Sequence, residues 1–364
     1  MHGGNIKKFA MKIGKSEKSI LDFSSNINPL GIPDSVASIY YDSLSSISHY
    51  PDPEVRELCE EIANRYSLSI DNIIAGNGSM SLIELVIRAI KPCHTLIVEP
   101  CFMEYRRLLE IYGAKVLSVR LSEKDGFRFS LSQIKSAMNN IEMMILGHPN
   151  SPTGTALEQK ELLILLNVAK KRKIFVLVDE AFCDWHPHLS VSNMLEENSS
   201  FIVIRSLTKF YALAGIRAGF ALGPKKIIKK MKAVQETWSC NALAQRLSIA
   251  ALRDEKYAQD CMNWFRAESS YFFKALSEIS SIKIYPSLTN FFLIKLLDKD
   301  KYSHLTQMLE SNGIYLRNSD GFKGLNKYFF RIAIRRREEN NFLLKIFKEA
   351  LSVEELLTES ALQY

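Results

Sequence analysis

Short apolar runs with no polar alternation recur along the first part of the chain, and helix-length segments separate several of them. A strand with one face in water alternates apolar and polar residues, whereas a strand buried on both faces does not. The clearest such runs are residues 95–98, 143–146, 175–178 and 201–204. The pattern therefore predicts an α/β fold with a mainly parallel sheet that is covered by helices on both faces.

The length of the chain, 364 residues, allows one large and one smaller domain. We expect an N-terminal arm over residues 1–35, a large domain over 36–235, and a smaller α/β domain with its connecting helix over 236–364. Prolines and a glycine in the arm predict an irregular conformation for residues 1 to about 30. A long helical stretch is expected from residue 224 to about 277.

Composition narrows the possible partners. Lys plus Arg exceed Asp plus Glu by 47 to 40, and no dense basic run with interleaved aromatic residues accompanies this net charge of +7. An enzyme for anionic substrates fits this balance better than a nucleic-acid-binding protein. The six cysteines lack metal-ligand spacing, and no apolar run approaches the ~20 residues of a membrane span. We therefore expect a cytoplasmic protein with reduced thiols, no metal site and no membrane partner.

Lys209 ends the motif Ser-Leu-Thr-Lys that follows the apolar run 201–204. The C-terminal end of a strand is the edge at which α/β sheets bind ligands, and a lysine amine there can form an imine with an aldehyde. Ser206 supplies a hydroxyl beside it, and Arg217 supplies a fixed charge suited to a phosphate. This set predicts an anchor for pyridoxal 5'-phosphate (PLP), with a surface Lys and Arg as the alternative.

Polar residues at three other strand ends extend this site. Asp179 follows the run 175–178, where a buried carboxylate could keep a pyridine nitrogen protonated, and Asn150 lies between two prolines, where it could donate to a phenolic oxygen. Gly78 and Ser79 precede a helix whose free N–H groups attract phosphate, with Ser79 as the expected N-cap. Asp179 as a helix cap and Asn150 as a turn former are the alternatives.

The ordered motifs GNGS, EPCFMEY, HPNSPTG, DEAF and SLTKFYALAGIR resemble the fold type I PLP-dependent enzymes of aminotransferase class I and II, over about residues 20 to 350. This resemblance implies an aspartate aminotransferase-like fold, PLP as cofactor and a homodimer. It implies catalytic roles for Lys209, which forms the imine, and Asp179, which faces the pyridine nitrogen. The other cofactor contacts that it implies are Asn150 on the phenolic oxygen, Phe102 on the ring, Gly78, Ser79, Ser206 and Arg217 on the phosphate, and Tyr50 from the partner subunit.

Two groups within this family compete. The YPDP turn resembles the histidinol-phosphate aminotransferases, whereas HGGN, LDFSSNINPLG, DEAF and RIAIR resemble more closely the threonine-phosphate decarboxylases of cobamide biosynthesis. Phe182 favours the decarboxylases, because the aminotransferases usually carry a tyrosine there. The implied reaction converts L-threonine O-3-phosphate to (R)-1-amino-2-propanol phosphate, or L-serine O-phosphate to ethanolamine phosphate. One methyl in an apolar pocket contributes only about 1 to 3 kcal/mol, so both substrates stay open.

A substrate with a carboxylate and a phosphate ester needs several cations or N–H donors. Arg317 and Arg331 are the candidates in the C-terminal part of the chain. Resemblance to the decarboxylases adds His2, Gly3 and Asn26 from the N-terminal arm, and Asn150 once more. Which group binds which anion stays open.

Overall fold

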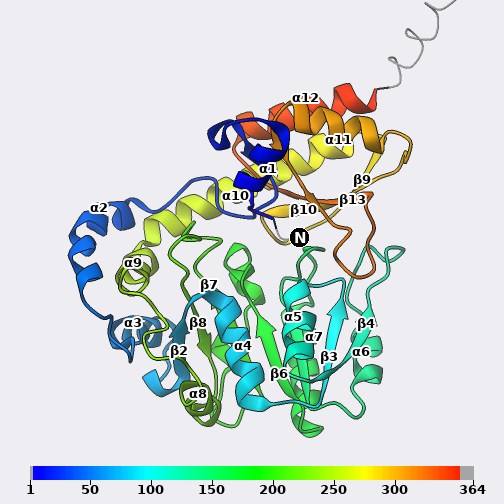
Figure 1. Ribbon diagram of the computed structural model, residues 1–364. Coiled ribbons are helices and arrows are strands. Elements are labelled where there is room, and N and C mark those ends of the chain that lie inside the picture. Colours follow the sequence, from blue (N-terminus) through cyan, green and yellow to red (C-terminus); the bar gives the residue numbers. More distant parts are fainter. Residues whose placement is uncertain (1–2, 353–364) are drawn as a thin grey trace, which may run out of the picture.

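The computed structural model describes residues 3–352. Its largest sheet has seven strands in the order β2-β8-β7-β6-β5-β3-β4 and occupies the lower half of Figure 1. The strands are β2 (Ile73–Gly76), β3 (His94–Glu99), β4 (Lys115–Arg120), β5 (Met143–Gly147), β6 (Phe175–Asp179), β7 (Phe201–Ser206) and β8 (Gly219–Leu222). Strand β8 runs opposite to the other six strands of this sheet, so the mainly parallel α/β sheet is confirmed.

Alternate residues of the central strands face two different apolar clusters. In β6, Val176 and Val178 belong to one cluster and Leu177 to the other. Helices α6 (Leu131–Ala137) and α7 (Gln159–Lys171) contribute to the first cluster, and α4 (Gly78–Ile90), α5 (Met103–Ile111) and α8 (Lys225–Lys232) to the second. Burial on both faces is the physical reason why these strands read as uninterrupted apolar runs.

A second sheet, antiparallel and in the order β12-β13-β10-β9, lies in the upper part of Figure 1. It consists of β9 (Ile282–Tyr285), β10 (Phe291–Leu296), β12 (Arg317–Asn318) and β13 (Phe329–Ala333). Helices α10 (Glu255–Ser277), α11 (Tyr302–Ser311) and α12 (Arg337–Leu351) accompany it. Strand β1 (Leu21–Asp22) pairs in parallel with β11 (Ile314–Tyr315), so the N-terminal segment is tied to this part of the molecule.

Two expectations about helices are wrong. Residues within the supposedly irregular arm form α1 (Ile6–Ile13), because the Asn5 side chain accepts from the Lys8 N–H at its start and Gly14 ends it in the left-handed conformation. The long helical stretch is divided into α8, α9 (Ala242–Arg253) and α10, since Asn241 and Asp254 cap new helices.

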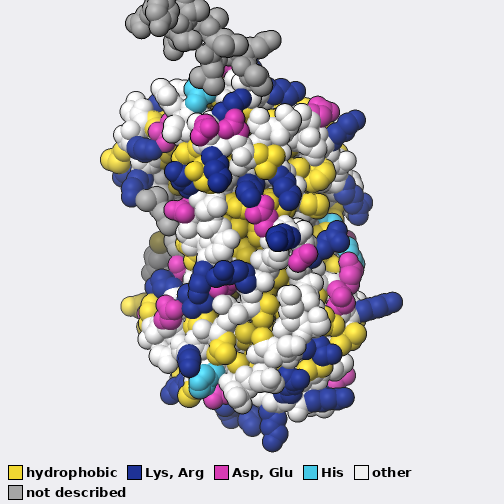
Figure 2. All heavy atoms as spheres, turned by 90° about the vertical axis from the view of Figure 1, so that its right-hand side faces the viewer, with side chains coloured by type: hydrophobic (Ala, Val, Ile, Leu, Met, Phe, Trp, Pro, Cys, Tyr) yellow, Lys and Arg dark blue, Asp and Glu magenta, His cyan; other side chains and the backbone are white. Residues whose placement is uncertain are grey.

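Helices α2 (Asp34–Ser43) and α3 (Arg56–Tyr66) pack against α9. The domain boundaries at residues 35 and 235 stay predictions. None of the helices within residues 3–352 combines the length and the apolar character that crossing a membrane requires. On the face seen in Figure 2, Lys and Arg side chains are spread over both halves of the molecule with Asp and Glu among them, in keeping with the modest net charge of +7.

Candidate active site

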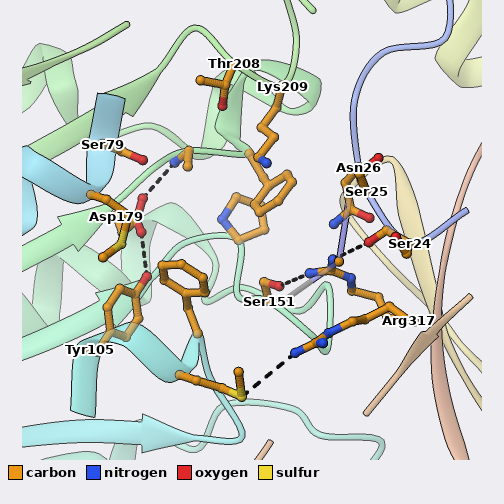
Figure 3. Close-up of a pocket in the computed structure, with 18 of the residues that line it drawn as sticks. Ser24, Ser25, Asn26, Ser79, Tyr105, Ser151, Asp179, Thr208, Lys209 and Arg317 are labelled. Atoms are coloured by element: carbon orange, nitrogen blue, oxygen red, sulfur yellow. Dashed lines mark hydrogen bonds between the residues drawn. The ribbon is translucent and has the colours of Figure 1, made fainter. Parts of the chain in front are cut away.

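A pocket of about 360 Å³ lies where the C-terminal ends of the large sheet's strands meet the N-terminal segment and the second sheet. Figure 3 shows its residues converging from these three parts of the chain. Of the residues proposed from the sequence, the pocket brings together Gly3, Asn26, Ser79, Phe102, Asp179, Lys209, Arg217, Arg317 and Arg331.

Four described residues proposed from the sequence are not among those that line the pocket. The Asn150 amide already donates to the Pro100 carbonyl and to the Thr153 hydroxyl, both at 2.8 Å. The Ser206 hydroxyl is 2.7 Å from that of Thr208, and it is Thr208 that reaches the pocket. The other two residues are Gly78, which lies against Arg217, and Tyr50, which is 80% exposed. His2, also proposed from the sequence, lies outside the described residues.

The start of α4 is suited to an anion. Asn77 is the N-cap without a side-chain hydrogen bond, and the first turn holds no acidic residue. The prediction of Ser79 as the cap is wrong, because Gly78, at φ +79°, lets the chain turn from β2 directly into the helix. A Cβ at Gly78 would lie 2.6 Å from Nη2 of Arg217, so the guanidinium packs onto the glycine beside the free N–H groups.

Lys209 and Asp179 are two titratable groups that line the pocket. Burial lowers the pKa of Lys209 to about 8, and the charges of Arg331 and Arg217 add to this effect while Asp179 opposes it. Burial raises the pKa of Asp179, but hydrogen bonds from Tyr105 and from the Ala181 N–H counteract it. The lysine is therefore a better nucleophile than an exposed lysine near neutral pH.

Two arginines face the same space without an acidic partner. Nη1 of Arg331 donates to the Ser151 hydroxyl and Nη2 to the Ser24 carbonyl, both at 2.9 Å. Arg317 lies with Nη2 3.9 Å from the sulfur of Met103. Within residues 3–352 neither arginine forms an ion pair with Asp or Glu. Burial and the charge of Arg317 lower the pKa of Arg331 to about 9, although the charge of Asp22 opposes them, and Arg331 stays protonated at neutral pH.

Asn26 is a further sign of a ligand. Its side chain is buried, and neither its amide nitrogen nor its oxygen has a hydrogen-bond partner in the described part of the chain. Buried polar atoms are nearly always paired, so unpaired ones that line a pocket favour a polar ligand. Buried cations without counter-ions favour an anionic one.

The sequence reasoning did not identify several pocket residues. Thr208 and Ser151 adjoin the predicted residues within their motifs, and a hydroxyl next to Lys209 was a usable signal. Phe322 comes from the loop after β12, where no sequence motif pointed to the site. The others are Ser24, Ser25, Met80, Met103, Tyr105, Pro149, Ala181 and Phe182, the last of which the sequence singled out only to distinguish two enzyme groups.

Comparison with known proteins identifies the family. The family described as aminotransferase class I and II matches residues 18–346. The threonine-phosphate decarboxylase of Salmonella typhimurium is 34% identical over 353 residues, 96% of each protein. The solved histidinol-phosphate aminotransferase from Clostridium acetobutylicum has a TM-score of 0.84 at 30% identity, over 91% of this chain and 98% of that one.

The histidinol-phosphate aminotransferase from Sinorhizobium meliloti, solved in complex with pyridoxal-5'-phosphate, shares the fold with a TM-score of 0.85 at 18% identity, over 95% of this chain and 94% of that one. These likenesses agree with the α/β architecture and with the motifs at the strand ends. The resemblance inferred from the sequence is confirmed: the chain belongs to the class I and II aminotransferase family.

Proposed function

We propose that this chain is a PLP-dependent decarboxylase that converts L-threonine O-3-phosphate to (R)-1-amino-2-propanol phosphate for the nucleotide loop of cobamides. One observation carries the proposal: Arg317 and Arg331, which form no ion pair with an acidic residue in the described part of the chain, share a pocket with Lys209. An amino acid O-phosphate carries two anions near one amine and so matches this set of charges. The identity to the decarboxylase of Salmonella typhimurium supports the same reaction.

The residues present fit PLP. The first turn of α4, with Ser79 and Arg217, would hold the phosphate. Glycine at position 78 lets the Arg217 guanidinium pack beside this turn, where a side chain would collide with it. Phe102 would lie against the ring, and Asp179 would pair with the pyridine nitrogen. When bound, PLP supplies an aldehyde that captures amines and a ring that accepts electrons from a bond at the substrate's α-carbon.

The chain's own groups decide which bond at the α-carbon breaks. Arg317 and Arg331 fix the two anions of the substrate, and Asn26 adds an unpaired amide to the same pocket. Lys209, with its pKa of about 8, can hold a proton and donate it to the α-carbon after carbon dioxide has left. Decarboxylation breaks the bond between the α-carbon and the carboxylate, whereas transamination breaks the C–H bond at the same carbon. The orientation in which the carboxylate is held therefore decides between the two reactions.

Three contacts inferred from the resemblance belong to the same proposal. Asn150 would contact the phenolic oxygen by exchanging its bond to Thr153, and Ser206 would contact the phosphate by exchanging its bond to Thr208. Tyr50 would reach the phosphate in a second subunit. Its exposed ring stacks on that of Trp238, which is also exposed, with 4.4 Å between centroids, and this surface supports a homodimer.

The proposal is tested with the purified, PLP-loaded chain and L-threonine O-3-phosphate in the absence of any keto acid. We expect carbon dioxide and the amine product in equal amounts, and none with Lys209→Ala. L-Serine O-phosphate, assayed in parallel, measures what the methyl contributes. Conversion of histidinol phosphate, without carbon dioxide from either amino acid phosphate, would overturn the decarboxylase in favour of an aminotransferase. Sedimentation velocity of the same sample tests the homodimer.

A further inference from the structure

Tyr105 is a buried residue of the pocket to which the proposed function gives no role. It lies in the first turn of α5, is 2% exposed, and lines the pocket. Its hydroxyl donates to Oδ2 of Asp179 at 2.6 Å, as the dashed line in Figure 3 shows. Helix α5 thus contributes a hydrogen bond to the carboxylate that ends β6.

Both oxygens of Asp179 are used. Oδ1 accepts from the Ala181 N–H at 3.0 Å, while Oδ2 accepts from Tyr105. Asp179 is only 7% exposed, and burial favours its neutral form, whereas hydrogen bonds to the carboxylate favour the ionised form. Among the charged neighbours, Glu180 raises the pKa of Asp179 and Lys209 lowers it.

The phenol is held in one place and in one protonation state. The ring of Tyr105 meets that of Phe102 edge-on, with 5.5 Å between centroids and 85° between planes. Burial raises the pKa of Tyr105 well above its ordinary value, and the neighbouring Asp179 and Cys101 raise it further. Tyr105 therefore remains a hydrogen-bond donor.

We propose that Tyr105 is a positioning residue that keeps the Asp179 carboxylate ionised and oriented toward the ring nitrogen of a pyridine cofactor. The inference rests on the proposed function for the identity of that cofactor. Tyr105 acts through Asp179, and its edge-on contact with Phe102 links the two side chains expected on the ring.

The test compares Tyr105→Phe with Tyr285→Phe. Tyr285 is also buried and also donates to a carboxylate, that of Glu123 at 2.9 Å, but it lies outside the pocket. The dissociation constant of PLP is measured for each apoprotein, together with the pH dependence of the bound cofactor's absorption. We expect Tyr105→Phe to bind PLP about 10- to 100-fold more weakly, the effect of losing a hydrogen bond to a charged group.

The absorption of the bound cofactor should also change. A ring nitrogen that is less often protonated withdraws fewer electrons, so the midpoint of the pH-dependent absorption should move upward in Tyr105→Phe and stay in place in Tyr285→Phe. With a cofactor analogue that has C–H in place of the ring nitrogen, wild type and Tyr105→Phe should bind equally. Incorporation of 3-fluorotyrosine at position 105 keeps the shape but strengthens the donor, and should move the midpoint downward.

Equal PLP affinity and equal spectra in wild type and Tyr105→Phe would overturn the inference, as would an equal loss in Tyr285→Phe. A loss of affinity that persists with the analogue would also overturn it, because it would show that Tyr105 acts through packing alone. If Tyr105→Phe does not fold, the fluorotyrosine protein decides, and an unmoved midpoint there refutes the role. Failure of the wild type to bind PLP would instead refute the proposed function.

Discussion

Arg331 and Ser151 connect the two sheets across the pocket: Nη1 of Arg331, on β13, donates to the Ser151 hydroxyl, in the loop after β5, at 2.9 Å. The same guanidinium reaches the carbonyl of Ser24, which follows β1. One cation is thus held by three segments that are far apart in the sequence, and its orientation is fixed before any ligand arrives.

Ser151→Ala should loosen that orientation without removing the charge. We expect the KM for L-threonine O-3-phosphate to rise about tenfold with kcat nearly unchanged, as for the loss of one hydrogen bond to a charged group. Steady-state kinetics checks this, with Ser136→Ala, on the surface of α6, as the control. An unchanged KM would show that Ser151 does not position Arg331.

Arg331→Lys and Arg317→Lys keep a positive charge but lose the planar fork that binds an oxyanion through two hydrogen bonds. Each should lower kcat/KM by roughly 100-fold. Arg335→Lys is the matched control, because Arg335 pairs with Glu339 and does not line the pocket. A loss in the control as large as in the other two variants would contradict anion binding in the pocket.

The lowered pKa of Lys209 predicts a pH dependence for cofactor capture by the apoprotein. The neutral amine is the nucleophile, so the rate should rise as pH increases through about 8, well below the 10.5 of an ordinary lysine. Arg331→Gln removes one positive neighbour, which should move the midpoint upward. Stopped-flow absorbance over pH 6 to about 10 measures both. A wild-type midpoint near that of free lysine would refute the shift.

Gly78→Ala should harm the protein in two ways. Its φ of +79° is unfavourable for alanine by about 1 to 2 kcal/mol, and its Cβ would collide with Arg217. Gly113→Ala, at φ +78° with no atom within 4 Å, carries the first cost alone. We expect both variants to lose similar stability in urea unfolding and only Gly78→Ala to lose PLP affinity. Equal PLP affinity in both would remove the case for a phosphate at α4.

Arg205 and Glu180 form a buried ion pair, 6% and 0% exposed at their side chains, with 2.8 Å between Nη1 and Oε2. Glu180 adjoins Asp179, so this pair supports the strand end that carries the site. Arg205→Gln leaves a buried carboxylate without its cation, and we expect a loss of about 3 to 5 kcal/mol in the free energy of unfolding. Arg56→Gln, which breaks an exposed pair with Glu60, should have no measurable effect on the unfolding transition.

Much of this architecture could be predicted from the sequence, because burial on both faces makes a strand such as β6 uniformly apolar and because polar residues at strand ends share one edge. For this reason the sequence predicts that Asp179 and Lys209 share one site, as they do. It does not predict helix α1, although Asn5 and Gly14 mark its ends, because the prolines further along favour an irregular arm.

Other features depend on contacts that no local pattern encodes. The use of the Asn150 amide by Pro100, and by Thr153 of its own loop, requires two distant segments to meet, and the orientation of Arg331 requires three. The sequence of β1 carries no sign that it pairs with β11, almost 300 residues later, with Leu21 opposite Ile314. Local propensity predicts elements, whereas such partners are decided by the tertiary packing.

That pairing also sets an order of assembly during synthesis. All seven strands of the large sheet end by Leu222, so the edge with Lys209 and Asp179 can form while later residues are still being translated. The segment with Asn26 has to wait, because β1 needs β11 and the Phe23 carbonyl needs the N–H of Ala333. A nascent chain therefore forms the part of the pocket around Lys209 first. The part around Arg331 forms only after β11 and β13 have been synthesised and the N-terminal segment has paired with them.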